Sequence, residues 1–242
     1  MALLRDSRPA MGTAVGITAY ADHAAIDAAY AEIESYEAEL SEWRPDSATS
    51  RLSQQGRVAL RPLALSLFDL AEDLRVSTGG AFDIGWRGGN AHREGSELVG
   101  TGRVDLGGIL KGFLADRAGD ALLNAGVEDF VIDAAGDVLA HGNAGDGHRG
   151  WPVTIVTDAA RWNIRLANEA VSTSAEDAQP DHIVDARSGQ PAHCLRAVAV
   201  TAATGTRADA SATAFYASCG RVALRDVHDI RWVGKNGWKH RR

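Results

Sequence analysis

A carboxylate, a glycine pair and a lysine stand close together in the segment 104–112, which reads VDLGGILKG. Glycines allow backbone N–H groups to converge on an anion, and a lysine neutralises phosphate as a point charge. The only lysines in the chain are at 111, 235 and 239, so nearly all its other cations are arginines. Asp105 and Lys111 are therefore candidates for phosphate binding, although the segment is neither a P-loop nor a GxGxxG fingerprint. The alternative is a strand-to-helix turn whose glycines serve packing.

Asp209 and Thr213 form a second candidate group. They lie four residues apart in a segment predicted to be helical, so their side chains share one face. A carboxylate and a hydroxyl together suit a hard cation such as Mg²⁺, which takes oxygen ligands and leaves positions open for substrate phosphates. The alternative is that Asp209 caps the helix while Thr213 bonds its own i−4 carbonyl, and the spacing alone favours this structural role.

His182 leads a third segment, 181–189, with the sequence DHIVDARSG. A histidine near an aspartate is able to act as a general base, although a hydrogen-bonded structural histidine is the commoner case. Further short pieces are compatible with caps and turns as well as with binding, and none identifies a function alone: 10–13 (AMGT), 41–47 (SEWRPDS), 78–84 (TGGAFDI) and 172–174 (STS).

Helices and strands that would position these residues follow from hydrophobic periodicity. Apolar residues recur every three or four positions over 24–43 and 63–74, which predicts amphipathic helices, and helices are also expected at 109–123 and 208–219. Runs of β-branched and apolar residues predict strands at 12–20, 129–134, 151–157, 162–166 and 195–202, with hairpin turns at 158–161 and at Asn236-Gly237. Mixed order without strict βαβ alternation favours an α+β fold with mostly antiparallel sheets and packed helices.

Composition sets limits on the class of protein. Among 242 residues, 25 Lys+Arg stand against 32 Asp+Glu, so the formal net charge is −7, and 45% of residues are hydrophobic. This is typical of a globular chain and argues against a nucleic-acid binder. No Pro/Ser-rich linker divides the chain, so we expect a single domain over residues 1–242, with two lobes around a cleft as one possible arrangement.

Neither an apolar run of about 20 residues nor a basic-then-apolar leader is present, so no membrane span is expected. As written, the sequence predicts a cytoplasmic protein; a periplasmic or membrane-anchored one would follow if an upstream signal had been removed. Cys194 and Cys219 have neither the number of a disulfide framework nor the spacing of a zinc site, so we expect small buried hydrophobes.

Read in order, these pieces resemble the ApbE family, the FAD:protein FMN transferases. The matching series is AMGT, SEWRPDS, TGGAFD, VDLGGIxKG, AGD, TS with HIVDxxSG, and ADxxxTA, from about residue 8 to residue 220. The resemblance implies an α+β fold related to the T-fold. It also implies a Mg²⁺-dependent reaction that splits FAD, releases AMP and attaches FMN to a threonine of an acceptor protein bearing a Ser/Thr-Gly-Ala-Thr-like site.

Site residues carried over from the family are expectations of this resemblance. The implied metal ligands are the carbonyl of Gly108 and the side chains of Asp209 and Thr213. The implied FAD contacts are Met11, Trp43, Ala81, Phe82, Asp83, Asp105, Lys111 and Val184. Trp43 and Phe82 either stack on a ring of FAD or belong to the core.

Phosphoryl transfer to a hydroxyl also needs charge neutralisation and a proton acceptor. Lys111 is the expected cation. His182 is the candidate base, and Asp209 is its rival if the metal does not fully engage the carboxylate.

Alanines replace the usual family residues at 135 and 175 (glycine) and at 186 (proline), and Ala212 stands where some members have an acidic residue. A Gly-to-Ala change matters only where the backbone needs a positive φ, so these departures are expected to be tolerable. They permit one alternative, a flavin carrier or sensor without catalysis. The resemblance leaves a second one open, a pyrophosphatase that converts FAD to FMN and AMP, because some members of the family transfer to water. Self-modification within 209–213 is disfavoured, because a buried metal ligand cannot also be a free acceptor.

Overall fold

The computed structural model describes residues 2–175, 181–234 and 237–241. Its elements, in chain order, are β1 (Ala2–Ala10), β2 (Thr13–Ala21), α1 (His23–Leu40), α2 (Ala48–Gln55), β3 (Arg57–Ala59), α3 (Pro62–Ser77), β4 (Asn90–Glu94), β5 (Glu97–Thr101), α4 (Leu110–Asn124), β6 (Phe130–Ala134), β7 (Asp137–His141), β8 (Trp151–Val156), β9 (Arg161–Leu166), β10 (Glu169–Ala175), β11 (Val184–Asp185), β12 (Gln190–Pro191), β13 (Leu195–Ala202), α5 (Gly205–Ala217), β14 (Val227–Gly234) and β15 (Gly237–Arg241).

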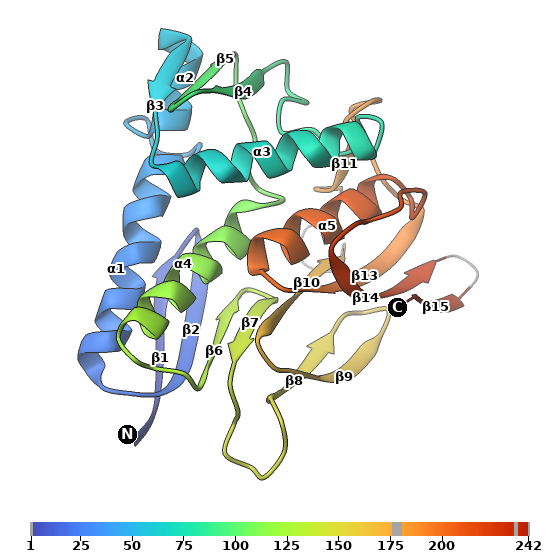
Figure 1. Ribbon diagram of the computed structural model, residues 1–242. Helices are drawn as coiled ribbons and strands as arrows, with labels where there is room; N and C mark the ends of the chain where they lie inside the picture. The colour runs from blue at the N-terminus through green and yellow to red at the C-terminus, as the bar shows by residue number, and fades with distance from the viewer. Residues whose placement is uncertain (1, 176–180, 235–236, 242) are drawn as a thin grey trace.

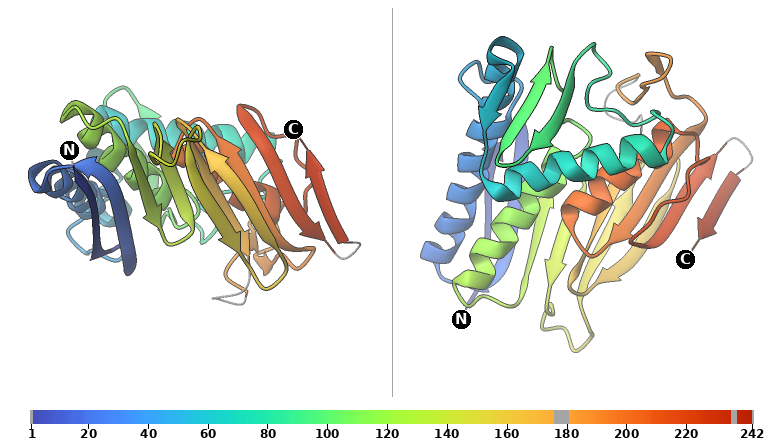
Figure 2. Two further views of the ribbon diagram at one scale, coloured as in Figure 1. Left: turned by 90° about the horizontal axis from the view of Figure 1, so that it is seen from below. Right: turned by 45° about the horizontal axis from the view of Figure 1, so that its top comes forward.

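An eight-stranded sheet organises the molecule, with the strand order β1-β2-β6-β7-β10-β13-β14-β15. Every neighbouring pair in this sheet is antiparallel. Seen from below, the strands run from the blue β1 edge to the red β15 edge (Figure 2). The predicted α+β class with mostly antiparallel sheets is confirmed.

Helices α1, α4 and α5 lie on the same side of this sheet, and α3 runs across α5 (Figure 1). Each buries an apolar face in the main core, as Ile26 and Ile33 do from α1 and Phe113 from α4. Helix α5 is rich in alanine and almost wholly buried, because small side chains let it lie close to both the sheet and α4. The α4–α5 contact is the one that matters most for the site.

The opposite face of the sheet is covered by the β8–β9 hairpin. Trp151, Ile155 and Trp162 of this hairpin pack in one apolar cluster with Val171 of β10 and Ala199 of β13. Strand β8 is therefore fixed against the sheet although it pairs only with β9 among the described strands.

The structure confirms the predicted helices and strands to within a few residues and adds several that the sequence patterns missed. Helix α1 ends at Leu40, so Trp43 lies in the turn that follows. Helix α5 begins at Gly205, and its cap is Thr204, whose hydroxyl accepts a hydrogen bond of 3.2 Å from the Arg207 N–H. The alternative that Asp209 caps this helix is therefore wrong. Asn236 lies outside the described residues, although Gly234 and Gly237 on either side are paired.

Cys194 and Cys219 form a disulfide, with Cα atoms 5.3 Å apart. The prediction of two separate buried thiols is wrong, because the packing of α5 against β13 brings together cysteines 25 residues apart in sequence. Among the described residues, no helix is long and apolar enough to cross a bilayer.

Candidate functional site

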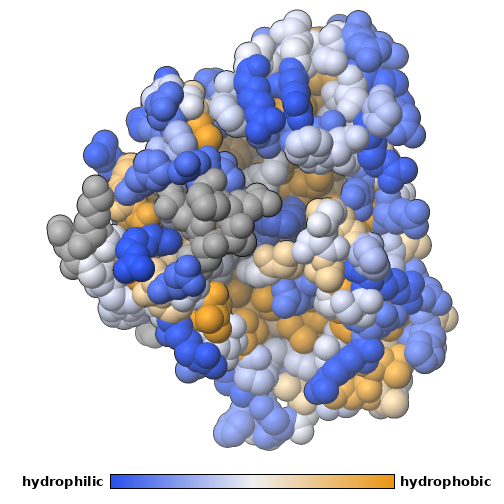
Figure 3. All heavy atoms as spheres, turned by 180° about the vertical axis from the view of Figure 1, so that it is seen from behind, coloured by the Kyte–Doolittle hydropathy of each residue, from blue (hydrophilic) through white to orange (hydrophobic). Residues whose placement is uncertain are grey.

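A cavity of about 1290 Å³ opens between the β1–β2 turn, the segments that follow α1 and α3, the start of α4, strand β8 and helix α5. The face seen from behind is hollowed near its centre, with hydrophobic atoms visible in the hollow (Figure 3). Every site residue predicted from the sequence lies on the cavity wall: Met11, Trp43, Ala81, Phe82, Asp83, Asp105, Gly108, Lys111, His182, Val184, Asp209 and Thr213. The fold therefore brings the candidates together, while the role of each stays a prediction.

Met11 stands at the tip of a two-residue hairpin between β1 and β2. Its φ is +54° and that of Gly12 is +70°, so both turn residues are left-handed, as a turn matched to the twist of the strands requires. The Met11 N–H donates to the Glu37 carboxylate of α1 at 3.0 Å. These constraints fix the methionine at one end of the cavity.

The β6–β7 turn has the same form, with φ values of +57° at Ala135 and +95° at Gly136. A left-handed conformation costs a non-glycine residue about 1–2 kcal/mol. The family departure at Ala135 therefore falls where the backbone does need a positive φ. The turn accommodates alanine there, but at the cost of this backbone strain. Ala175, by contrast, lies in β10 and has no positive φ.

The charged centre of the site is formed where α4 crosses α5. Asp209 of α5 accepts a hydrogen bond of 3.0 Å from the Gly112 N–H through Oδ2, and its Oδ1 lies 3.8 Å from Lys111 Nζ. Lys111 Nζ also forms an ion pair with Oδ2 of Asp137, the first residue of β7. Asp209 is 2% exposed, whereas the Lys111 side chain is 32% exposed, and both residues line the cavity.

Burial and the negative charge of Asp137 raise the pKa of the Asp209 carboxyl well above its ordinary value, against the opposing effect of Lys111. Burial alone would lower the pKa of Lys111, but the carboxylates of Asp209 and Asp137 outweigh it and raise that pKa. Lys111 therefore stays a cation at neutral pH. Asp209 is a carboxylate for which a bound cation would be a favourable neighbour.

Thr213 and Gly108 face one another across this centre. A Cβ on Gly108 would lie 3.0 Å from Thr213 Oγ1 and 2.7 Å from its Cγ2, so only glycine lets the two segments approach this closely. Asp209 lies on the same face of α5 as Thr213. One carboxylate, one hydroxyl and one backbone carbonyl are hard oxygen donors and fit Mg²⁺, which binds few protein ligands and shares the rest with water and phosphate.

Within residues 2–175, 181–234 and 237–241, no group of three or more His, Cys, Asp or Glu side chains is arranged to hold a metal ion. The protein donors for a cation here would thus be one carboxylate together with the hydroxyl of Thr213 and the carbonyl of Gly108.

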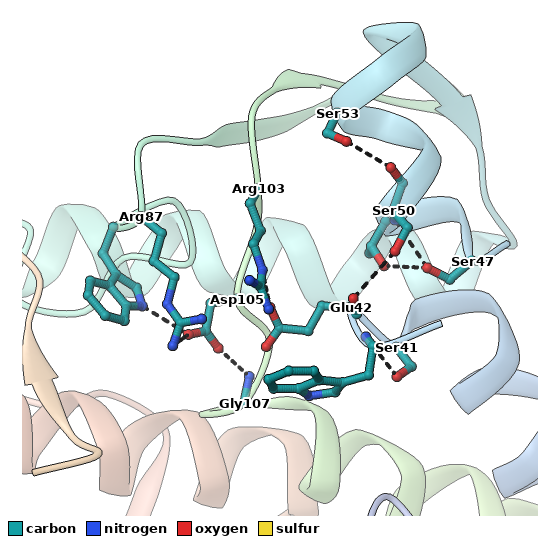
Figure 4. A network of polar contacts seen from close by, with 12 residues as sticks. Ser41, Glu42, Ser47, Ser50, Ser53, Arg87, Arg103, Asp105 and Gly107 are labelled. Carbon is teal, nitrogen blue, oxygen red and sulfur yellow. Dashed lines mark hydrogen bonds and ion pairs between the residues drawn. The ribbon is translucent and has the colours of Figure 1, made fainter. Parts of the chain in front are cut away.

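A second polar network surrounds Asp105 (Figure 4). Its carboxylate accepts hydrogen bonds of 3.0 Å from Trp86 Nε1 and from the Gly107 N–H, and it lies 3.5 Å from Arg87. The bond to Gly107 fixes the glycine turn that leads into α4, so Asp105 shapes the segment that carries Gly108 and Lys111.

Trp43 is 78% exposed, so the alternative that it belongs to the core is wrong. The Arg103 guanidinium lies 5.3 Å from the centre of its ring and also bonds the neighbouring Glu42 at 2.9 Å. Burial, followed by the charge of Asp105, raises the pKa of Glu42 despite this arginine. The indole is thus an exposed aromatic surface on the cavity wall, supported from one side.

Phe82 combines both roles considered for it. It is 6% exposed, packs in the main core and lines the cavity. Its neighbour Ala81 accepts a hydrogen bond of 3.1 Å from the Ala186 N–H, which ties this segment to the residue that follows β11. Proline, the usual family residue at 186, has no N–H for this bond.

His182 is exposed at the cavity wall, one residue before the buried Ile183.

On the same wall Thr173 of β10 has a buried hydroxyl oxygen with no hydrogen-bond partner among the described residues. A buried polar atom without a partner is costly, so Thr173 is a further candidate for ligand contact.

Sequence reasoning did not find Thr173, Asp137 or Ser172 individually, although each lies in a short piece that carried the family resemblance or adjoins one. Asp137 is 3% exposed and accepts a hydrogen bond from the Ser172 hydroxyl. Their importance depends on contacts between strands, which spacing along the chain does not reveal.

Comparisons with known proteins agree with this geometry. The model of the ApbE family matches residues 11–88 and 85–225. A FAD:protein FMN transferase of Rhodobacter capsulatus is 33% identical over 125 residues, which span 46% of this chain but only 23% of that relative. The flavin transferase ApbE of Vibrio cholerae has a TM-score of 0.87 at 22% identity, over 99% of this chain and 96% of that chain. For the flavinyl transferase ApbE of Pseudomonas stutzeri the TM-score is 0.84 at 21% identity, over 99% and 94%. The chain belongs to the ApbE family.

Proposed function

We propose that the chain transfers FMN from FAD to a threonine of an acceptor protein and releases AMP, in a reaction that requires Mg²⁺. The observation that carries this proposal is the convergence of Lys111, Asp209, Thr213 and Gly108 on the wall of one large cavity. Membership of the family supports flavin transfer, because the relatives described above are flavin transferases by name.

Asp209, Thr213 and the Gly108 carbonyl would hold the cation beside the pyrophosphate. When bound there, Mg²⁺ neutralises the charge of phosphate oxygens and of the departing AMP. Lys111 adds a second positive charge from the protein itself, in a centre where water is partly excluded and electrostatic effects are strong. Trp43, the segment 81–83, Asp105, Val184 and Met11 would hold the rest of FAD.

The acceptor hydroxyl attacks the phosphorus of the FMN half, the bond from that phosphorus to the bridging oxygen breaks, and AMP leaves with this oxygen. His182 is the group that would take the hydroxyl proton, since it is exposed on the cavity wall. Asp209 is the weaker candidate, because its Oδ2 already accepts from Gly112 and its Oδ1 faces Lys111. If water replaces the acceptor, the same chemistry gives FMN and AMP.

The test is incubation of the purified chain with FAD, with and without Mg²⁺, and with and without a peptide that contains Ser-Gly-Ala-Thr. AMP and FMN are separated by chromatography, and the mass of the peptide is measured. We expect Mg²⁺-dependent AMP release and an FMN adduct on the peptide threonine, both lost in Asp209→Ala. The matched control is Asp229→Ala, because Asp229 is paired with Arg231 on β14, away from the cavity lining.

Release of free FMN without an adduct would replace the transferase with a pyrophosphatase. FAD that is bound but stays intact with peptide and Mg²⁺ would contradict both activities and leave a carrier.

A further inference from the structure

Lys111 lies between two buried carboxylates and is closer to the one that is not a candidate metal ligand. Its Nζ contacts Asp137 Oδ2 directly but is 3.8 Å from Asp209 Oδ1. We propose that Asp137, held by Ser172, is a positioning residue that keeps the Lys111 ammonium off Asp209 and directed at the pyrophosphate, so that Asp209 stays available to the cation. This inference rests on the proposed function of the site.

Both oxygens of Asp137 are engaged. Oδ2 accepts from Lys111, and Oδ1 accepts from the Ser172 hydroxyl. Asp137 is 3% exposed and Ser172 is 1% exposed, and neither is among the described residues that line the cavity. Asp137 is thus placed to act through Lys111 and not as a base or a direct ligand.

Strand pairing fixes this arrangement before any ligand is present. Strands β7 and β10 are antiparallel neighbours with Val138 opposite Val171. Asp137 and Ser172 are the next residues along each strand, so the register places them side by side. The carboxylate therefore cannot follow the lysine if the latter moves, and it acts as a fixed anchor.

Loss of the Asp137 charge would leave Asp209 as the remaining carboxylate within reach of the ammonium. Attraction between opposite charges is strong in a poorly solvated site, so Lys111 would then pair with Asp209. The oxygen that faces the lysine is also needed by the cation, and cation binding would weaken. A general electrostatic role of Asp137 predicts weaker cation binding too, but independently of Lys111.

A double-mutant cycle separates these two explanations. Mg²⁺ affinity is measured calorimetrically without FAD in the full chain, in Asp137→Asn, in Lys111→Met and in the double variant. We expect Asp137→Asn to weaken Mg²⁺ binding about tenfold, the lower end for residues that orient a metal site from outside. In the Lys111→Met background the same substitution should change the affinity less than about twofold. Asp229→Asn serves as the matched control and should bind Mg²⁺ like the unchanged chain.

Equal losses in both backgrounds would overturn the inference, as would an unchanged affinity in Asp137→Asn. If Lys111→Met does not fold, Ser172→Ala decides, because it removes only the hydroxyl that holds Asp137 and keeps every charge. We expect a smaller loss of Mg²⁺ affinity in Ser172→Ala, about threefold by the same reasoning. An unchanged affinity overturns the inference.

If the unchanged chain binds no Mg²⁺, the proposed metal site fails and this inference with it. That result differs from equal affinities in the unchanged chain and Asp137→Asn, which refute the positioning role alone.

Discussion

The backbones of Gly112 and Gly205 are in direct contact where α4 crosses α5: a Cβ on Gly112 would lie 2.0 Å from the Gly205 carbonyl oxygen. This approach places the Gly112 N–H within 3.0 Å of Asp209 Oδ2. One turn further along α4, Asp116 accepts hydrogen bonds of 2.6 and 2.8 Å from the N–H groups of Gly205 and Thr206. The position of the Asp209 carboxylate is thus set by a contact between two helices.

Gly112→Ala should therefore separate these helices. Overpacking of this kind costs about 1–3 kcal/mol of the free energy of unfolding, and the added methyl would meet backbone that cannot move aside easily. We expect urea denaturation to show this loss and calorimetry to show weaker Mg²⁺ binding. Gly16→Ala is the control, since a Cβ there meets nothing within 4 Å. Unchanged stability in Gly112→Ala would contradict the close helix contact.

Ala135→Gly should stabilise the chain. Ala135 has a φ of +57°, a conformation that glycine adopts without steric cost. We expect a gain of about 1 kcal/mol, which corresponds to a rise in Tm of about 2–4 °C for a chain of this size. Ala175→Gly is the matched control, because Ala175 has no positive φ and glycine should there cost about 0.5–1 kcal/mol. Thermal unfolding that moves the same way in both variants would show that backbone strain at Ala135 is not the cause.

The sequence was sufficient to predict helices α1, α3, α4 and α5, strands β2, β6, β8, β9 and β13, and the residues around the cavity. Helix α1 repeats its apolar residues at the helical period, and its core face is the predicted one. Lys111 stood out because it is one of only three lysines in the chain. Asp209 and Thr213 stood out by residue type, and the family resemblance, not their spacing, made them candidate metal ligands. All three residues could be found in the sequence although they lie on two different helices, because Lys111 belongs to one short motif and Asp209 and Thr213 belong to another.

What could not be predicted depends on contacts between elements distant in the chain. The Cys194–Cys219 disulfide and the Asp137–Ser172 pair both join residues on different elements. Strand β1 has mixed polar residues and half-exposed faces, so its pairing with β2 leaves little trace in its pattern. The positive φ of Ala135 follows from a two-residue turn, whose length is known only once β6 and β7 are placed.

Stability without metal should depend on pH through Asp209. Its folded-state pKa is raised above the ordinary 3.8 by burial and Asp137, so the folded chain favours the protonated form. The stability from this carboxyl is fully present below the unfolded pKa and is lost as pH rises through the folded pKa. Asp209→Asn, which cannot ionise, should gain in Tm relative to the unchanged chain as pH rises from about 5 to about 8 in EDTA.

Mg²⁺ should reverse the Tm difference between the unchanged chain and Asp209→Asn at high pH, because it binds the ionised carboxylate. We expect added Mg²⁺ to raise the Tm of the unchanged chain more at high pH than at low pH, and to leave Asp209→Asn unaffected. Asp229→Asn is the control and should respond to Mg²⁺ like the unchanged chain. A Tm difference between the unchanged chain and Asp209→Asn that does not vary with pH would show that Asp209 is not perturbed as described.

Trp43→Ala should weaken FAD binding without affecting the fold. The indole is 78% exposed on the cavity wall, so much of its ring surface is available to a planar ligand. The Arg103 guanidinium lies over the ring and supports it. Stacking on an aromatic ring contributes about 0.5–1.5 kcal/mol, which corresponds to about a two- to tenfold loss of affinity. The loss is measured by titration of FAD fluorescence without Mg²⁺, so that no turnover occurs. Trp238→Ala is the matched control, since Trp238 is 57% exposed on β15 and is not among the residues that line the cavity. Because exposed substitutions usually change stability by less than about 0.5 kcal/mol, both variants should unfold at nearly the same temperature.

Equal FAD affinities in the two variants would contradict the prediction and would mean that the exposed indole of Trp43 does not stack on FAD.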